Sequence, residues 1–335
     1  MPRVTFAGRA HEVAGGTTVL DALLADGVEL PHACRAGACG ACVVRVRSGP
    51  VPPGCQVGLP PAWIARGCVY ACQCRPEVDL AIEPLGEGLR VAGEVVSTAP
   101  LSGSVARVVV RVPEAFSPAR GQYVTLERRG IARSFSVADR AGTALELHVR
   151  RIPGGALSPY LCDDARPGDP LSVAGPFGDC VYGEISPDVP LLLAATGTGL
   201  APLWGIVLDA LTAGHRAPIW LFHGAVDPSG LYLRAELRAL AARHANLRYV
   251  PSALHAGAGG DGEVLEEGPL DAVVLRHVPA TRGMRAFVCG APDIVQVVKK
   301  KIFLAGAATR DISSDAFLPA AAPSEPTRAS PGRAG

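Results

Sequence analysis

The chain has 335 residues, which at about 150 residues per domain predicts two to three domains. Hydrophobic residues make up 48% and charged residues 19%, a composition that builds folded cores and excludes a disordered chain. Lys and Arg number 32 against 31 Asp and Glu, so the net charge of +1 gives no indication of a nucleic-acid partner.

The apolar segments are short. The longest, residues 189–195, is far below the roughly 20 residues that span a bilayer, and the first six residues lack the apolar core of a signal peptide. We therefore expect a cytoplasmic protein without a membrane partner. In that reducing compartment ten cysteines are not a disulfide framework, and their clustering between Cys34 and Cys74 indicates metal or cluster ligation.

The first region, residues 1–88, shows the patterns of short strands and one small helix. Strands are expected at residues 4–6, 11–13 and 43–47. Thr18 is placed to cap a helix whose apolar side is Val19, Leu20, Leu23 and Leu24, and Gly27 ends it. The Gly-Glu-Gly stretch at 86–88 is the expected linker to the next region.

A run of cysteines in this region gives the strongest chemical signal. Cys34, Cys39 and Cys42 have the C-x4-C-x2-C spacing of plant-type [2Fe–2S] sites. The residues between them are small, so the chain can wrap around two irons and bring backbone N–H groups near the sulfides. The fourth ligand must come from later in the chain, and Cys72 and Cys74 would share one face of a strand. A zinc site is the alternative, but it favours paired C-x2-C units, of which only one is clear here.

The second region, residues 89–186, is rich in strand patterns that Gly and Pro interrupt. Strands are expected at residues 105–112, 123–126 and 145–149. This arrangement predicts a small antiparallel β-barrel.

The third region, residues 187–318, alternates strands with helices. The continuous apolar run at 190–195 is typical of a strand buried on both faces, and a glycine loop follows it. Further elements are expected as helix 202–211, strand 219–222, helix 231–242, strand 285–288 and helix 292–304. Such alternation predicts an α/β unit with a parallel sheet. The Ala-, Pro- and Ser-rich tail at 319–335 is expected to be disordered.

The segment from Tyr70 to Pro76, Tyr-Ala-Cys-Gln-Cys-Arg-Pro, resembles the LACQxxP segment of plant-type ferredoxin domains. The resemblance implies a β-grasp ferredoxin fold for residues 1–88 and a [2Fe–2S] cluster. It also implies that Cys72, rather than Cys74, completes the ligand set with Cys34, Cys39 and Cys42.

Three motifs of the second region resemble, in order, those of the ferredoxin-NADP reductase superfamily. That resemblance implies FAD contacts for all four residues of Arg133-Ser134-Phe135-Ser136. By this resemblance Arg133 pairs with the FAD pyrophosphate, Phe135 lies along the flavin and Ser136 bonds near N5. The family's Tyr is Phe135 here, so one hydroxyl contact is lost. The second motif is a phosphate segment at a helix start, and it implies FAD contacts for His148, Val149, Arg150, Gly154, Gly155, Ala156, Leu157 and Ser158. The third motif, Gly175-Pro176-Phe177-Gly178, resembles the family's closing G-P-x-G.

The third region resembles the pyridine-nucleotide domain of the same superfamily. Its glycine turn implies pyrophosphate contacts for Gly197, Thr198, Gly199 and Pro202. Cys289, Gly290 and Pro292 match the C-G-x-P motif, in which the cysteine lies beside the nicotinamide. Phe317 ends a D-A-F segment whose aromatic ring lies close to the isoalloxazine.

The nucleotide is expected to be NADH. Asp227 would repel a 2′-phosphate and suits a ribose hydroxyl. Arg234 and Arg238 would contradict this preference if they faced inward, but residues of this kind on a helix are more often solvated.

The order of the three regions is similar to that of single-chain reductases of aromatic-ring dioxygenase systems, above all the naphthalene-dioxygenase type. The resemblance implies an NADH-dependent oxidoreductase that passes electrons through FAD and [2Fe–2S] to a Rieske-type ferredoxin or a terminal oxygenase, and a monomer is expected. Similar reductases serve deoxysugar dehydratases or diiron hydroxylases of the phenol-hydroxylase type. A non-catalytic [2Fe–2S] redox-sensing module is the alternative of another class.

Overall fold

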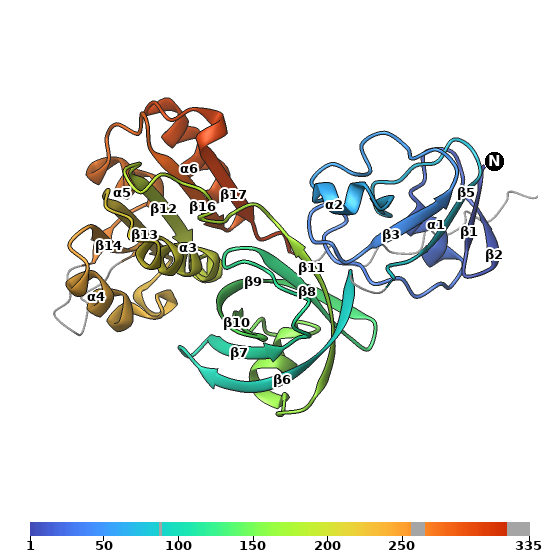
Figure 1. The fold of residues 1–335 in the computed structure, drawn as a ribbon, viewed down its shortest axis with the longest axis horizontal. Helices are drawn as coiled ribbons and strands as arrows, with labels where there is room; N and C mark the ends of the chain where they lie inside the picture. Colours follow the sequence, from blue (N-terminus) through green and yellow to red (C-terminus); the bar gives the residue numbers. More distant parts are fainter. Residues whose placement is uncertain (87–88, 256–264, 320–335) are drawn as a thin grey trace, which may run out of the picture.

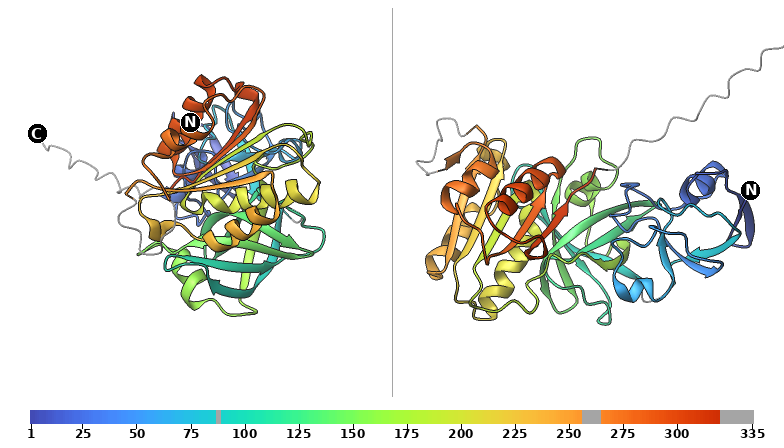
Figure 2. Two further views of the ribbon diagram at one scale, coloured as in Figure 1. Left: turned by 90° about the vertical axis from the view of Figure 1, so that its left-hand side faces the viewer. Right: turned by 90° about the horizontal axis from the view of Figure 1, so that it is seen from above.

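The computed structural model describes residues 1–86, 89–255 and 265–319. Three sheets follow one another along the chain, and Figure 1 shows the barrel between the other two. Figure 2 shows the same order from above. The predicted fold class, with a ferredoxin-like unit, an antiparallel barrel and a parallel α/β unit, is confirmed.

The N-terminal sheet has the strand order β2-β1-β5-β3-β4, with β1 and β5 parallel and the other pairs antiparallel. Its helix α1 begins after Thr18, whose hydroxyl accepts a hydrogen bond from the backbone N–H of Asp21, as the sequence predicts. The elements are β1 (Arg3–Phe6), β2 (Arg9–Glu12), α1 (Val19–Ala25), β3 (Val43–Ser48), α2 (Pro61–Ile64), β4 (Cys68–Tyr70) and β5 (Leu80–Pro84).

The middle unit is a closed six-stranded antiparallel barrel in the order β10-β7-β6-β11-β8-β9. The strands are β6 (Arg90–Pro100), β7 (Val105–Arg111), β8 (Tyr123–Arg128), β9 (Ile131–Ala141), β10 (Ala144–Arg150) and β11 (Pro170–Phe177), with a short helix η1 (Tyr160–Asp164) between β10 and β11. The sequence patterns identify only β7, β8 and β10 as strands. In β6, β9 and β11, charged residues, Gly and Pro interrupt the alternation of apolar and polar residues that identifies a strand.

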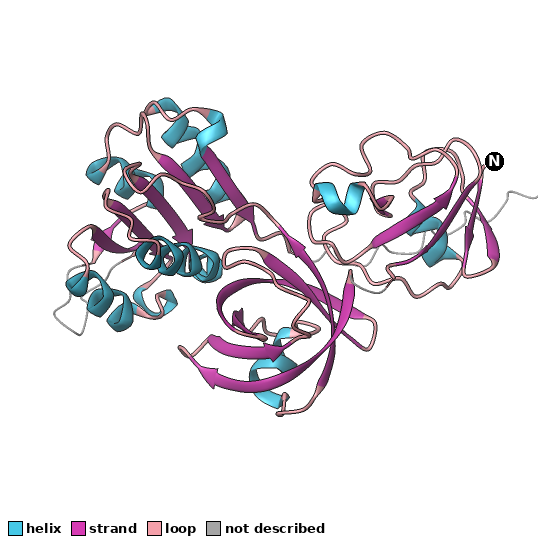
Figure 3. Ribbon diagram, in the orientation of Figure 1, coloured by secondary structure: helices cyan, strands magenta, loops and turns pink. Residues whose placement is uncertain are grey.

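The third unit is a six-stranded parallel sheet in the order β15-β14-β13-β12-β16-β17. Figure 3 shows that most of the helices belong to this unit. Its strands are β12 (Leu191–Thr196), β13 (Ile219–Ala225), β14 (Leu247–Ala253), β15 (Glu266–Glu267), β16 (Arg285–Gly290) and β17 (Ile312–Ala316). Its helices are η2 (Gly197–Gly199), α3 (Leu200–Thr212), η3 (Pro228–Gly230), α4 (Arg234–Arg243), α5 (Leu270–His277), α6 (Pro292–Leu304) and η4 (Thr309–Asp311).

One helix differs from the sequence-based expectation. The helix expected from residue 231 begins at Arg234, because Leu233 before it has φ 56°, a left-handed conformation that no helix interior accepts. Residues 87–88 of the expected linker, and the expected disordered tail from residue 320 on, lie outside the described residues. Within the described ranges, every helix is too short or too polar to cross a bilayer.

Candidate redox site

The four cysteines expected to hold the cluster form two pairs. The thiols of Cys34 and Cys39 lie close enough to shift each other's pKa, and so do those of Cys42 and Cys72. A two-iron cluster needs two thiolates on each iron, so two adjacent pairs suit it. Across the described residues, no three His, Cys, Asp or Glu side chains are grouped to hold a single metal ion.

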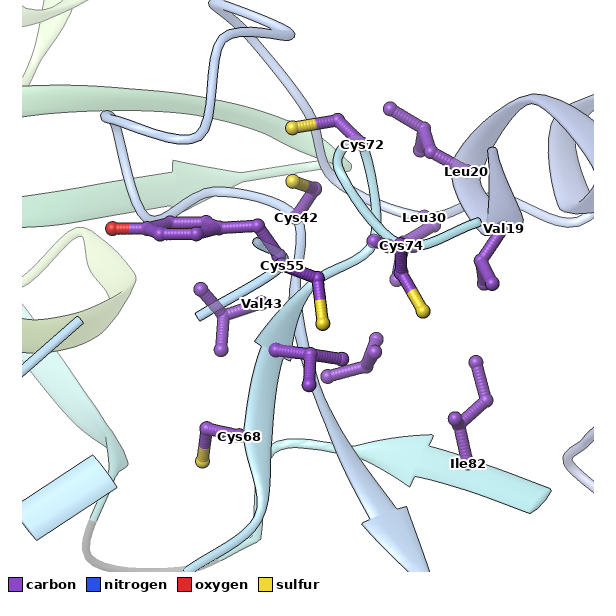
Figure 4. Packing of buried hydrophobic residues seen from close by; sticks show 14 of the residues in the cluster. Val19, Leu20, Leu30, Cys42, Val43, Cys55, Cys68, Cys72, Cys74 and Ile82 are labelled. Atoms are coloured by element: carbon purple, nitrogen blue, oxygen red, sulfur yellow. The ribbon is translucent and has the colours of Figure 1, made fainter. Parts of the chain in front are cut away.

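The structure separates Cys72 from Cys74. Figure 4 shows the Cys72 sulfur beside that of Cys42, while the Cys74 sulfur points away from both. Cys74 and Cys55 have no measurable exposure and lie close enough to shift each other's pKa, and the Cys55 thiol donates to the carbonyl oxygen of Pro52 over 2.9 Å. The expectation that both cysteines share a strand face is wrong, because β4 ends at Tyr70 and the following residues form a turn.

Backbone and amide groups surround the cysteine sulfurs. The backbone N–H of Ala36 donates to Cys34 Sγ over 3.3 Å, and the Gln73 side chain donates to Cys72 Sγ over 3.6 Å. The Cys39 thiol and nearby N–H groups lower the pKa of Cys34 to about 5. The Cys42 thiol and Gln73 lower the pKa of Cys72 to about 7. In each pair the other thiol, that of Cys39 or Cys42, has its pKa raised by the same neighbour and by burial.

Glycine is required in this loop by geometry as well as by size. Gly37 has φ 67°, and a Cβ there would lie 2.8 Å from Cγ of Gln73. Gln73 in turn donates to the carbonyl oxygen of Arg35 over 2.9 Å. A larger residue at position 37 would displace the amide that faces the Cys72 sulfur.

The expected flavin residues lie on β9 opposite β8. In that register Tyr123 pairs with Ser136, Val124 with Phe135 and Thr125 with Ser134. Ser136 is buried, Phe135 is half-buried against the barrel core, and Arg133 is half-buried with Nη1 donating to the Ala132 carbonyl oxygen over 2.7 Å.

His148 has a use that sequence reasoning does not predict. Its Nδ1 lies 3.0 Å from the hydroxyl of Tyr232, in the third unit, and its Nε2 lies 3.0 Å from the Glu146 carboxylate. Burial lowers the pKa of His148 although Glu146 opposes this shift. Both ring nitrogens thus have protein partners, and the imidazole links the barrel to the parallel sheet.

The expected phosphate segment forms a tight turn before η1. Gly154 has φ 68° and open space around its Cα, and Ser158 Oγ accepts from the backbone N–H of Ile152 over 3.1 Å. A Cβ at Gly155 would lie 2.9 Å from the Ile152 carbonyl oxygen. Ala156 and Leu157 complete the turn, and the Leu157 side chain lies in the barrel core. Val149 and Arg150 are the last two residues of the preceding strand β10. The turn leaves backbone room for a phosphate, as the FAD expectation requires.

The two nucleotide motifs of the third unit meet in space. A Cβ at Gly199 would lie 2.2 Å from the Cys289 carbonyl oxygen, and a Cβ at Gly290 would lie 2.2 Å from Oγ1 of Thr196. That hydroxyl accepts from the backbone N–H of Ala291 over 2.9 Å. Thr198 lies between the two turn glycines in η2, and Pro202 and Pro292 lie in the first turns of α3 and α6. Glycine is therefore needed where the two strand ends pack backbone to backbone.

Cys289 lies at the end of β16 with two unexpected neighbours. Its buried thiol lies 4.0 Å from the Cys180 sulfur, and burial raises its pKa. The backbone N–H of Phe317 donates to the Gly290 carbonyl oxygen over 2.8 Å, so the D-A-F segment lies beside the C-G-x-P motif.

The residues expected to select the nucleotide give mixed indications. Asp227 is exposed, and its Oδ1 accepts from the backbone N–H of Ser229 over 3.0 Å. Arg234 and Arg238 are half-buried and lie close enough to Tyr249 to oppose the upward shift that burial gives its pKa. The expectation that both arginines lie on a solvated face is therefore wrong.

A cavity of about 240 Å³ lies where the three units meet. Each unit contributes part of its wall. The ferredoxin-like unit contributes Gly37, Ala38, Gly58 and Tyr70, and the end of the barrel contributes Tyr123, Gly178, Asp179 and Cys180. The third unit contributes Ser314, Asp315, Ala316 and Leu318, near the end of the described chain. Burial and the nearby Asp179 raise the pKa of Asp315 to about 6. Sequence reasoning did not single out Tyr123, Asp179 or Asp315 as cavity residues, because only the fold brings these distant segments together.

Comparison with known proteins agrees with this geometry. Residues 4–77 match the model of the 2Fe-2S iron-sulfur cluster binding domain, residues 92–182 that of the oxidoreductase FAD-binding domain and residues 193–300 that of the oxidoreductase NAD-binding domain. The reductase subunit of an aromatic O-demethylase from Amycolatopsis sp. is 33% identical, over 95% of this chain and 98% of that protein.

Two further relatives extend the comparison. A ferredoxin–NAD(P)(+) reductase component of naphthalene 1,2-dioxygenase/salicylate 5-hydroxylase systems from Ralstonia sp. is 32% identical, over 91% of this chain and 94% of that protein. The crystal structure of an Amycolatopsis cytochrome P450 reductase superposes with a TM-score of 0.67 at 29% identity, over 95% of this chain and 99% of that one.

Proposed function

The chain belongs to the family of ferredoxin–NAD(P)+ reductase components of oxygenase systems, and we propose that it takes electrons from NADH and delivers them to an oxygenase, or to a ferredoxin that serves one. As a member of this family it is an NAD-dependent oxidoreductase with FAD and a [2Fe–2S] cluster. When bound, the FAD accepts a hydride from NADH, and the cluster accepts single electrons.

The proposal assigns a part of the chain to each cofactor. Residues 1–88 bind the cluster through Cys34, Cys39, Cys42 and Cys72, whose spacing fits a [2Fe–2S] site and whose thiols lie in two neighbouring pairs. Residues 89–186 bind FAD, with Arg133 on the pyrophosphate. Residues 187–318 bind NADH, and Cys289, Ser136 and Phe317 hold the nicotinamide and flavin against each other.

The observation that supports this function best is the cavity between the three units. The cysteine loop, the barrel end and the last described strand all contribute to its wall, and Cys180 of that wall touches Cys289. A chain that merely sensed redox state through the cluster would have no need of such a meeting point. Segments that adjoin the three proposed cofactor sites instead meet at this cavity.

The acceptor is proposed to be a Rieske-type ferredoxin or a terminal oxygenase, and the protein to act as a cytoplasmic monomer. The names of the relatives support an oxygenase system but differ in its type, since one reduces a cytochrome P450 and another serves a dioxygenase. A deoxysugar dehydratase or a diiron hydroxylase of the phenol-hydroxylase type is the second candidate class of acceptor.

Anaerobic titration with NADH, and separately with NADPH, tests the proposal. Visible flavin and [2Fe–2S] bands should bleach together with NADH and more weakly with NADPH, whose 2′-phosphate meets Asp227. Equal bleaching would contradict the NADH preference and point to Arg234 and Arg238. A protein without a flavin band after addition of FAD would contradict the reductase function and favour the redox-sensing module.

The fourth cluster ligand is tested with a matched pair of variants. Cys72→Ser should lose the visible [2Fe–2S] absorbance, whereas Cys74→Ser should retain it, because the Cys74 sulfur points away from Cys42 and Cys72. The iron content of each purified variant is the direct measurement. Loss of iron from Cys74→Ser alone would reverse the assignment.

A further inference from the structure

Three hydroxyl groups of the barrel reach the cysteine loop of the ferredoxin-like unit. Thr125 on β8 donates to the carbonyl oxygen of Cys39 over 2.7 Å, and Ser134 on β9 donates to the same oxygen over 2.6 Å. The hydroxyl of Tyr123 donates to the carbonyl oxygen of Ala38. The two bonds on Cys39 use both lone pairs of one carbonyl, so they fix its direction as well as its position.

The contact between loop and barrel is also tightly packed. Gly40 lies against the ring of Phe177, and a Cβ there would lie 2.4 Å from two ring atoms. Phe177 belongs to the barrel strand β11 but is fully buried in the ferredoxin-like core, where its ring lies 4.7 Å from Trp63 and 5.3 Å from Tyr123. Ala132 of β9, also fully buried, packs with Ala33, Ala41 and Cys39.

We propose that Thr125, Ser134 and Tyr123 are positioning residues that clamp residues 38–40 to the outer wall of the barrel, so that the cysteine loop is held in one place instead of moving on a tether. This inference rests on the proposed function, in which Cys39 is a cluster ligand. It assigns the clamp hydroxyls no part in binding iron.

The position of the clamp explains what it would achieve. Ser134 lies between Arg133 and Phe135, the residues proposed to bind FAD, and its hydroxyl bonds directly to the peptide of a proposed cluster ligand. The rate of electron transfer falls steeply with separation, and a small displacement of a positioned group costs a large factor in rate. Because Arg133 and Phe135 also lie on β9, a cysteine loop fixed to β8 and β9 keeps a constant distance to these proposed FAD residues.

The test removes the hydroxyl groups of Thr125 and Ser134 and keeps the shape of the side chains nearly unchanged. Thr125→Val is nearly isosteric and lacks only the donor, so Thr125→Val combined with Ser134→Ala leaves the Cys39 carbonyl without both bonds. Thr125→Ser keeps the donor and serves as the rescuing variant. Ser97→Ala, at an exposed position of β6, is the matched control for loss of a hydroxyl.

The first measurement is amide hydrogen exchange of residues 36–42 in the cofactor-loaded protein, which requires no turnover. The double variant should exchange about tenfold faster in this loop, since lost hydrogen bonds lower the cost of local opening. Thr125→Ser and Ser97→Ala should match the wild type. Unchanged exchange in the double variant would overturn the clamp.

The second measurement separates the clamp from the proposed function. In Thr125→Val alone, which leaves the flavin motif intact, reduction of the flavin by NADH, followed with ferricyanide as acceptor, should stay within twofold of wild type, while reduction of the cluster should slow several-fold in rapid mixing. The electron paramagnetic resonance lines of the reduced cluster should broaden as the loop takes several positions. Cluster reduction at the wild-type rate with unbroadened lines would overturn the inference. A wild-type protein that NADH does not reduce would contradict the proposed function instead, and the exchange data would still decide the clamp.

Discussion

At the scale of single residues, His223 shows how burial fixes a protonation state. Its ring is completely buried on β13, and Nε2 lies 3.2 Å from the carbonyl oxygen of Gly197. A carbonyl only accepts, so Nε2 bears the hydrogen and the neutral ring donates it. Burial lowers the pKa of His223 to about 4. The ring therefore stays neutral near pH 7 and holds the first residue of the nucleotide turn.

This burial predicts a dependence of stability on pH. An unfolded histidine has a pKa of about 6.5. Between that pH and about 4, His223 is therefore protonated in the unfolded chain but neutral in the folded one. The free energy of unfolding of the wild type should therefore fall as the pH decreases, by about 2 kcal/mol from this group alone between pH 7.5 and 5. His223→Gln keeps a donor without the titration and should lose that part of the fall.

Urea unfolding at both pH values, followed by the fluorescence of Trp204 and Trp220, measures the effect. His244→Gln, at the C-cap of α4, controls for the loss of a histidine elsewhere. The same decrease with pH in His223→Gln and in the wild type would show that another group causes it.

The cysteines show what residue-level reasoning can and cannot reach. The spacing of Cys34, Cys39 and Cys42 identifies a cluster loop without any structure, because three ligands lie within nine residues. The choice between Cys72 and Cys74 depends on where β4 ends, two residues earlier, and spacing alone does not give that boundary. The pairing of Cys55 with Cys74 joins positions 19 apart through the folding of a loop, and no local pattern indicates it.

At the scale of elements, the ends of β12 and β16 form one backbone contact. The turn after β12 and the turn after β16 touch at Gly199 and Gly290, and Thr196 bonds across them. The helices that follow, α3 and α6, both begin at this contact. Their N-terminal N–H groups are thereby brought to the same edge of the sheet, where a nucleotide pyrophosphate is favoured.

A single methyl group tests this contact. Gly199→Ala would place Cβ 2.2 Å from the backbone oxygen of Cys289, which is not free to move as a side chain is. Since Gly199 has φ −57°, the substitution adds no backbone strain, and any effect is steric. We expect NADH affinity to fall at least about tenfold and the melting temperature to fall by several degrees.

Isothermal titration with NAD+ and thermal unfolding are the measurements. Gly103→Ala, in open space with an ordinary backbone conformation, is the control and should change neither. A Gly199→Ala protein with wild-type affinity would mean that the two turns separate when nucleotide binds.

Elements differed in how well the sequence predicted them. The strand at β12 and the helix α6 were predicted almost to the residue, because a fully buried strand is continuously apolar and Pro292 marks a helix start. β14 and β17 were missed. β14 contains Arg248, Tyr249 and Pro251, and β17 reads Ile-Ser-Ser-Asp-Ala, so their pairing partners rather than their own patterns define them as strands.

At the scale of the whole molecule, the barrel is joined to the parallel sheet by polar side chains as well as by packing. Arg120 lies between them, with Nε 2.6 Å from Asp139 of β9 and Nη1 2.7 Å from Asp209 of α3. Gly205 of α3 packs so closely that a Cβ would lie 2.8 Å from Cβ of Arg120. His148 and Tyr232 make a second link. These contacts set how the two nucleotide-binding units face each other.

Replacing this arginine should loosen the two units. Arg120→Gln leaves two half-buried carboxylates without their cation, so we expect a loss of about 1 kcal/mol in stability, reduced by solvent screening. The rate of flavin reduction by NADH should fall several-fold, while the FAD content of the purified protein stays unchanged.

Rapid mixing with NADH and the ratio of flavin to protein absorbance supply the two readouts. Arg216→Gln removes an exposed pair with Asp188 and should alter neither quantity. Loss of FAD in Arg120→Gln would show that the arginine supports the barrel itself, not its position against the sheet.

The sequence predicts the three units and their order but not how they are placed. Their placement depends on single side chains that contact residues far away in the chain. Phe177 of the barrel packs into the ferredoxin-like core, and the Thr125 hydroxyl donates to the carbonyl oxygen of Cys39, 86 residues earlier. Nothing in the local pattern of either segment marks it as an interface. Only the shape and polarity of the two folded surfaces decide it.

The composition of the cavity wall has a consequence for biosynthesis. Its wall includes Gly37 and Ala38, which are made early, and Ser314 to Ala316 and Leu318, which are made near the end of the described chain. The ferredoxin-like unit and the barrel are therefore synthesised while one side of the cavity is still missing. β17 adds the last part of the wall only once translation has passed it.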